Sequence, residues 1–262
     1  MSSEGNEMSF WDHLEVLRGT LFRSILAILL FTVVFLSIKG PLFKVVLWPS
    51  SEEFILYKLL HLPFKMELIN IDVSAQFFVH LKVSVLAAVV IAFPYIIWEI
   101  WKFVAPALYE NEKKAVGTAF GMSSGLFYLG AAVGYFIVLP VCLMFFMNYT
   151  VSDDIANTIS LNSYISLFVS MVFLIGLIFE FPTVVVVLSS LGILTKDHLR
   201  QYRKHAFVVI LILAAFITPS DPVSMFVLAV PLYTLYEFSI LMCKKGEPKD
   251  EEETETADDI TE

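Results

Sequence analysis

Apolar residues occur in six long runs, each of 16 to 28 residues and each with at most one Asp, Glu, Lys or Arg. An α-helix needs about 20 apolar residues to cross the ~30 Å hydrocarbon core of a bilayer. Backbone that faces lipid has no water to bond, so it must form its hydrogen bonds within a helix. The pattern therefore predicts an all-α membrane protein with six transmembrane helices, over residues 19–38, 77–98, 115–139, 163–190, 204–219 and 223–242.

The last two predicted helices are short, and the cluster Thr218-Pro219-Ser220-Asp221-Pro222 separates them. Its two prolines prevent one continuous helix, because proline has no backbone N–H and clashes with the preceding turn. If the pair formed a re-entrant hairpin instead of two spans, the chain would still return to the same side. The predicted topology holds for either arrangement.

The third predicted helix carries glycines at four-residue spacing, namely Gly117, Gly121 and Gly125, then Gly130 and Gly134. Small residues at this spacing let two helices approach closely. We expect this packing inside one subunit. Packing between subunits of a homo-oligomer is the alternative interpretation.

Lysines and arginines are distributed unevenly between the two sets of loops. One set, together with the chain ends, carries Arg18, Arg23, Lys102, Lys113, Lys114, Lys196, Arg200, Arg203, Lys204, Lys244, Lys245 and Lys249. The other carries Lys39, Lys44, Lys58, Lys65 and Lys82. Because cytoplasmic loops are enriched in Lys and Arg, we expect both termini in the cytoplasm and the protein in the plasma or inner membrane.

The segment 39–76 is the long extracytoplasmic stretch of this topology, and three prolines divide it into short amphipathic pieces. We expect it to form a cap over the helix ends. Aromatic residues of the membrane interface sit at the level of the lipid headgroups. We expect that position for Trp48, Phe54, Phe64, Phe77 and Phe78.

The composition agrees with a membrane protein, with 58% hydrophobic and 16% charged residues, against roughly 45–50% and about 25% in soluble domains. Much of the net charge of −9 lies after Lys245. The chain divides into a cytoplasmic amphipathic segment 1–18, a transmembrane domain 19–242 and an acidic, disordered cytoplasmic tail 243–262. The tail has two interpretations, a solubilising segment or a weak docking segment for basic partners.

Few residues indicate chemistry of a catalytic or metal-binding kind. Cys142 and Cys243 fall on opposite sides of the predicted membrane, so they cannot pair within one chain. The sequence has no phosphate-binding Gly-rich loop and no HExxH or similar constellation. We expect no enzymatic activity, no cofactor, no metal and no nucleic-acid partner.

Glu180, followed by Pro182, is an acid deep inside an otherwise uncharged predicted helix. A carboxylate at this depth costs a few kcal/mol and indicates a functional site by default. The proline loosens the helix and frees a backbone carbonyl, which favours a water-lined cavity on the concave side. The alternative is a protonated Glu180 that is hydrogen-bonded to a neighbouring helix.

Two segments on the predicted cytoplasmic face mix acids, bases and aromatic residues, Phe10-Trp11-Asp12-His13-Leu14-Glu15-Val16-Leu17-Arg18 and the stretch from Trp98 to Lys114. Ordinary short loops there would be basic and polar. The mixture indicates either a recognition surface or simple anchoring at the interface.

At these residues the sequence resembles the TatC family, the multispanning core of the twin-arginine translocase. The resemblance runs from Phe10 to about Lys245. It rests on several motifs in the same order: the N-terminal F-W-D-H-L-E-x-L-R, the stretch from Pro94 to Glu112, Phe179-Glu180-x-Pro182, Thr218-Pro219-x-Asp221-x-x-Ser224, and then Pro231 with Leu235-Tyr236-Glu237.

The resemblance implies a cup-shaped subunit of six helices with both ends cytoplasmic. Such a subunit binds the Arg-Arg signal peptides of folded cargo proteins and acts with TatA/TatB-type single-span partners, driven by the proton-motive force. By position, Glu112 matches the family's loop carboxylate for the arginine pair, with Phe103 and Pro94 as neighbours, and Arg18 matches the arginine of the N-terminal motif.

The sequence departs from the family pattern at three places. Val16 stands where members often carry Glu, which leaves Glu15 as the N-terminal recognition carboxylate. Ser220 and Met225 replace the Pro and Gln that are common near the fifth-to-sixth helix turn, while Thr218 of that polar partner-binding site remains. The alternative function is a proton-coupled small-molecule transporter that uses Glu180, and an intramembrane enzyme is a third class.

Overall fold

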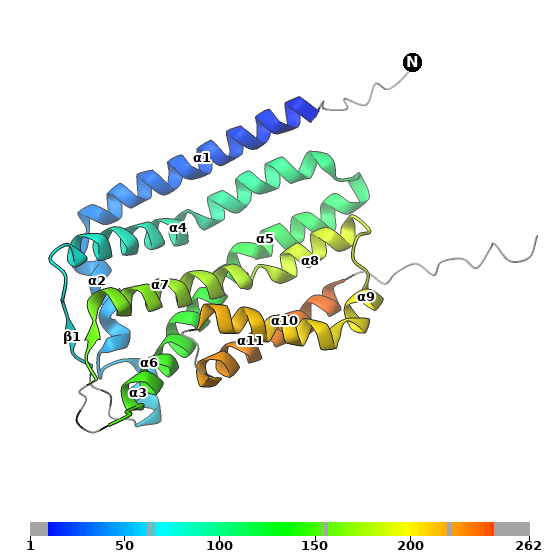
Figure 1. Ribbon diagram of the computed structural model, residues 1–262. Coiled ribbons are helices and arrows are strands. Elements are labelled where there is room, and N and C mark those ends of the chain that lie inside the picture. The colour runs from blue at the N-terminus through cyan, green and yellow to red at the C-terminus, as the bar shows by residue number, and fades with distance from the viewer. Residues whose placement is uncertain are drawn as a thin grey trace, which may run out of the picture.

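The computed structural model describes residues 10–61, 64, 66–152, 154, 157–218 and 222–243, and these form a bundle of long helices with a small cap at one end (Figure 1). The bundle consists of α1 (Phe10–Ser37), α4 (Ala75–Val104), α5 (Glu110–Val133), α6 (Leu139–Asn148), α7 (Leu161–Ile178), α8 (Phe181–Ser190), α10 (Arg203–Ile217) and α11 (Pro222–Met242). The short helix α9 (Lys196–Gln201) leads into α10.

Among the described residues, five helical stretches are long and apolar enough to cross a membrane. They are His13–Ser37, Ala75–Val104, Lys113–Asn148, Leu161–Ser190 and Ser224–Met242. The remaining predicted span corresponds to α10, whose 15 residues rise only about 22 Å. The fifth helix is therefore short, as predicted. The sixth was predicted to be short as well, and this was wrong, because α11 has 21 residues and is long enough to cross a membrane.

The third and fourth predicted helices are interrupted where prolines remove backbone donors. The π-helical turn η3 (Gly134–Val138) joins α5 to α6, and Pro140 lies in the first turn of α6. The helix tolerates a proline there because the π-helical turn, in which the N–H of Leu139 bonds to the carbonyl of Gly134, already alters the pattern of helical hydrogen bonds. The predicted end of this helix at residue 139 was therefore wrong, since the helix continues to Asn148. Pro182 likewise lies in the first turn of α8.

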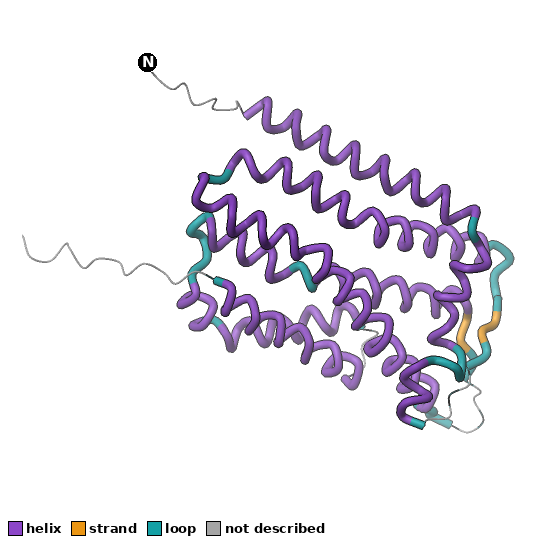
Figure 2. The backbone as a smooth tube through the Cα atoms, turned by 180° about the vertical axis from the view of Figure 1, so that it is seen from behind, coloured by secondary structure: helices purple, strands orange, loops and turns teal. Residues whose placement is uncertain are grey.

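The cap is built from α2 (Lys39–Leu47), η1 (Trp48–Ser50), α3 (Ile55–Leu60) and the strand β1 (Leu68–Ile69), which pairs in parallel with β2 (Ile159–Ser160). Figure 2 shows both strands beside the ends of the long helices. Tyrosine hydroxyls hold the cap to the bundle. Tyr164 donates to the carbonyl of Val46 at 2.7 Å, and Tyr135 donates to the carbonyl of Val45 at 2.7 Å.

Two of the five aromatic side chains expected at the headgroups form the core of the cap instead. Phe54 is fully buried between Trp48, Tyr57 and Tyr135, and Phe64 packs on Tyr57. A cap without long helices must bury its own aromatic side chains to be stable, which explains the difference. Phe77 and Phe78 are exposed at the start of α4.

The start of α1 and the end of α11 lie at the same end of the bundle, opposite the cap (Figure 1). Helix α1 packs mainly along α4, while α7 lies among α4, α5 and α6. The chain runs along the bundle an even number of times, so its two described ends lie at the same end of the bundle. The end of the bundle that carries them also carries the α4–α5 turn.

Candidate functional site

Toward the end opposite the cap, charged side chains link the middle of α1 to the last two turns of α4. Glu99 of α4 is only 2% exposed, and each of its carboxylate oxygens accepts a hydrogen bond from a cation. Arg23 Nε, from α1, donates to Oε2 at 2.7 Å, and Lys102 Nζ donates to Oε1 at 3.0 Å. A buried carboxylate is stable only when its charge is paired in this way. We call these three residues the α1–α4 clasp.

Aromatic side chains extend the same contact toward α5. His13 of α1 stacks on Phe103 of α4, with 4.3 Å between the ring centroids. The Trp101 ring lies 5.2 Å from that of Phe120, and it lies so close to Gly117 that a Cβ there would stand 3.2 Å from it. The ends of α1 and α4 and the start of α5 therefore form one packed surface.

The turn between α4 and α5 is short and anchored. It consists of η2 (Ala105–Ala107), in which Pro106 fixes one φ angle, and of Leu108, which is buried. Helix α5 then begins at Glu110, so the backbone of Glu112 lies in its first turn. The side chain of Glu112 is outside the part of the chain that the structure describes.

The other residues predicted for peptide recognition lie on two helices. Glu15 and Arg18 are exposed on α1, at the same end of the bundle as Phe103. Pro94 is exposed inside α4, nine residues before Phe103 and so about 14 Å away along the helix axis. The structure therefore brings Glu15, Arg18 and Phe103 to one end of the bundle. Pro94 lies farther from that end along α4.

Pro94 has a structural partner on α5. Because proline lacks an N–H, the carbonyl of Val90 one turn earlier loses its helical hydrogen bond. The hydroxyl of Tyr128 donates to that carbonyl at 3.0 Å. The proline thus creates an acceptor that links α4 to α5.

Sequence reasoning missed the α1–α4 clasp. Arg23 and Glu99 were assigned only to topology and to a mixed surface, although each is a charge within or at the end of an apolar run. The sequence did contain a signal for this pair. Arg23 and Glu99 carry opposite charges at similar depths in two predicted helices, and charges in membrane helices pair with one another.

Glu180 lies at the joint between α7 and α8. It is 8% exposed, and Ser123 Oγ of α5 donates to its Oε2 at 2.5 Å. Neither Oε1 nor the Thr183 hydroxyl forms a hydrogen bond with the described residues. The Ser123 hydrogen bond fits the alternative interpretation, whereas the Oε1 atom without a partner fits a water-lined cavity, so both interpretations of Glu180 stay predictions.

The turn between α10 and α11 is described only at its edges. Thr218 is 4% exposed, and its hydroxyl donates to the carbonyl of Ala214 at 2.9 Å. It also borders a cavity of about 550 Å³ between α6, α7 and the end of α10. Pro219 and Asp221 lie outside the described residues.

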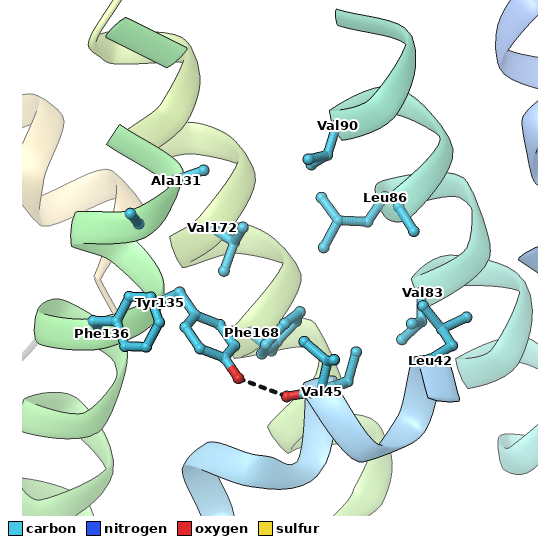
Figure 3. A pocket seen from close by; sticks show the side chains of 13 residues that line it. Leu42, Val45, Val83, Leu86, Val90, Ala131, Tyr135, Phe136, Phe168 and Val172 are labelled. Carbon is cyan, nitrogen blue, oxygen red and sulfur yellow. Dashed lines mark hydrogen bonds between the residues drawn. The ribbon is translucent and has the colours of Figure 1, made fainter. Parts of the chain in front are cut away.

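An apolar cavity of about 340 Å³ opens between α4, α5 and α7, and α2 closes it at the cap end (Figure 3). Leu86 and Val90 project into it from α4, Val172 from α7, and Leu42 from α2. The Tyr135 hydroxyl at its border is already bonded to the backbone of Val45. The cavity therefore suits an apolar chain and offers no polar chemistry.

Known proteins match this chain over most of its length. The family model of the Sec-independent protein translocase protein TatC matches residues 12–231. The TatC protein of Blattabacterium sp. subsp. Periplaneta americana is 34% identical in an alignment of 256 positions that covers 92% of this chain and 96% of that protein. The TatC protein of Helicobacter pylori strain 26695 is 39% identical over 207 residues, 78% of this chain and 79% of its own length.

The structural comparison gives the same result. A crystal structure of the twin-arginine translocase receptor TatC in DDM superposes with a TM-score of 0.74 and 33% identity, covering 88% of this chain and 99% of that chain. The predicted six-span, cup-shaped helical fold and the predicted family are thereby confirmed. The chain belongs to the TatC family and is a multispanning membrane component of the twin-arginine, Sec-independent protein translocase.

Proposed function

We propose that this subunit binds the Arg-Arg signal peptides of folded cargo at the bundle end that carries the α1–α4 clasp. The clasp is the observation that supports this most directly. Arg23 and Lys102 already neutralise Glu99, so this carboxylate is committed to holding α1 against α4. Glu15, exposed on α1, and Glu112, in the first turn of α5, are then the acids for the peptide.

Glu112 is the residue that we assign to an arginine of the peptide. A guanidinium presents a planar fork that bonds a carboxylate at two points, whereas a lysine ammonium is a point charge. Such a contact contributes roughly 1.5–3 kcal/mol, and partial desolvation at the membrane boundary raises it above the ~0–1 kcal/mol of an exposed pair. Micromolar affinity requires about 8 kcal/mol. Glu112 therefore sets specificity more than total affinity.

The apolar part of the signal peptide supplies the remaining free energy in this proposal, along the lipid-facing side of the cup. Phe103 stacks on His13 and in this way positions the α4–α5 turn for peptide binding. Arg18 contributes to the same binding surface from the exposed side of α1. Pro94 contributes through the α4–α5 link at Tyr128.

The remaining parts of the proposal concern assembly and orientation. The subunit acts with TatA/TatB-type single-span proteins, which contact the turn of Thr218, Pro219 and Asp221, and the proton-motive force drives export without enzymatic activity of this chain. Both termini face the cytoplasm. Residues 39–76 serve as an extracytoplasmic cap, and segments 1–18 and 243–262 are cytoplasmic.

The test is crosslinking of the purified protein to a photoreactive signal peptide with Arg-Arg, compared with the same peptide with Lys-Lys. We expect the Arg-Arg peptide to crosslink to α1 and to the α4–α5 turn, and the Lys-Lys peptide to bind about tenfold more weakly. Glu112→Gln and Glu112→Lys should both lose this discrimination, the second more severely.

Glu53→Gln provides the matched control, because Glu53 is an exposed acid in the cap at the opposite end. It should bind both peptides as the unmodified protein does. Discrimination that survives in both Glu112 variants would reject the assignment of Glu112 and direct attention to Glu15. Equal crosslinking of the two peptides to the unmodified protein would reject the proposed function itself.

A further inference from the structure

A second cavity lies at the cap end of the bundle, away from all the residues assigned to peptide recognition. It has a volume of about 460 Å³ and lies between α2, the start of α4 and the start of α7. Its polar lining comes from Lys39, Gln76 and His80, and none of the described residues that line it is acidic. The cavity therefore has a basic and hydrogen-bonding wall without a compensating carboxylate.

His80 is the unusual member of this wall. Its side chain is only 9% exposed, yet its Nε2 atom is buried without a hydrogen-bond partner among the described residues. The ring lies beside Phe43, with 5.7 Å between the centroids, which offers no acceptor for an N–H. Buried polar atoms in folded proteins nearly always have a partner, and one without a protein partner indicates a missing ligand, ion or water.

The cavity lies beside the ends of membrane-spanning helices, where we expect the headgroup level of a bilayer. Lys39 follows the end of α1 by two residues, and Gln76 is the second residue of α4. Phe77, next to Gln76, is 65% exposed, as an aromatic side chain at the interface is. Polar lipid groups and protein residues at helix ends meet at this level.

We propose that this cavity binds the phosphate group of an anionic phospholipid. The exposed ammonium of Lys39 faces the phosphate as a counter-ion, and Gln76 supplies N–H donors to its oxygens. The imidazole of His80, whose Nε2 is shielded behind the cavity wall, rotates toward the ligand to donate its own N–H. Phe43 and Leu161 provide apolar wall for the glycerol esters and the first methylene groups. A zwitterionic lipid brings a second cation toward Lys39 and binds less well. The site is independent of peptide binding.

The experiment measures lipid binding to the purified full-length protein in detergent by native mass spectrometry, with phosphatidylglycerol, phosphatidylcholine and inorganic phosphate as separate probes. We expect phosphatidylglycerol to bind about tenfold more tightly than phosphatidylcholine, and inorganic phosphate to bind more weakly than either. Lys39→Gln and His80→Phe should each weaken phosphatidylglycerol binding about tenfold, the loss of one charge-assisted or buried hydrogen bond. Phe at position 80 keeps a ring of similar volume, so the cavity wall is retained.

Lys44→Gln is the matched control, since Lys44 is an exposed lysine of the same helix that does not line the cavity. It should leave phosphatidylglycerol binding unchanged. An equal loss in Lys44→Gln and Lys39→Gln would show general surface attraction and overturn the proposal. Equal binding of the two lipids would overturn it too, and so would binding of inorganic phosphate as tight as that of the lipid, because the ligand would then be a free anion.

Discussion

Glu99 shows how one buried acid can organise a membrane helix pair. Its carboxylate has lost nearly all contact with solvent, whereas its partners Arg23 and Lys102 keep side-chain exposures of 49% and 52%. The cations therefore give up little hydration, while the acid gains two charge-assisted hydrogen bonds. This asymmetry makes the α1–α4 clasp stabilising, although a fully buried ion pair is often neutral.

We predict that Glu99→Gln lowers the free energy of unfolding by about 1–3 kcal/mol, the loss of hydrogen bonds between charged groups. Arg23→Gln should cost less, because Lys102 still pairs with the acid. Thermal unfolding of the purified variants measures both, and Glu53→Gln, an exposed acid in the cap, serves as the control. An unchanged midpoint in Glu99→Gln would contradict the role of the clasp.

At the level of helices, the glycines of α5 and η3 divide into two groups. A Cβ on Gly134 would lie 2.6 Å from the carbonyl oxygen of Met171, and one on Gly130 would lie 2.6 Å from the Phe179 ring. Both positions therefore pack against the α7–α8 region of the same chain. Gly121 and Gly125 have open space around the equivalent atom. Intramolecular packing thus accounts for only part of the glycine repeat.

Gly134→Ala should lower the free energy of unfolding by about 1–3 kcal/mol, because the backbone of α7 must move away from the added methyl group. Gly125→Ala makes the same chemical change in open space, and its better helix propensity should leave stability unchanged or raise it by up to about 1 kcal/mol. Thermal unfolding of the two variants compares them directly. Equal destabilisation would contradict the close contact at Gly134.

The length of α10 carries a prediction of its own, since its 15 residues reach about 22 Å against ~30 Å of hydrocarbon. We expect the bilayer to thin locally around it. Four leucines inserted after Ala214 add about 6 Å and rotate the following residues by only about 40°. Export of a reporter cargo should fall more than the thermal stability of the purified protein. Equal export by the lengthened variant would remove any role for the mismatch.

For the molecule as a whole, the sequence predicted the span number, the family and the fold, because charge-free runs leave few alternatives in lipid. The predicted helices run through Pro94, Pro182 and Pro231, but the third one ended at residue 139, although the helix continues to Asn148. The π-helical turn just before Pro140 shows how the helix continues past this proline. The sequence did not predict the partners of Arg23 and Tyr128, which depend on how α1, α4 and α5 are placed in space.

Orientation in the membrane is the last prediction, and it concerns the whole molecule. The bundle end with both described chain ends also carries Lys102, Lys113 and Lys114, so we predict from the distribution of basic residues that this end lies in the cytoplasm. In a variant without Cys142 and Cys243, which are both buried, single cysteines at Asn111 and Glu53 report the two ends.

An impermeant maleimide applied to intact cells should label Glu53→Cys and leave Asn111→Cys unlabelled, and permeabilised cells should label both. Both positions lie close to a helix start, so similar labelling of the two in permeabilised cells is the control for local accessibility. Labelling of Asn111→Cys from outside intact cells would reverse the orientation. The proposed peptide site would then face away from the compartment in which cargo folds, and a cytoplasmic receptor function could not be maintained.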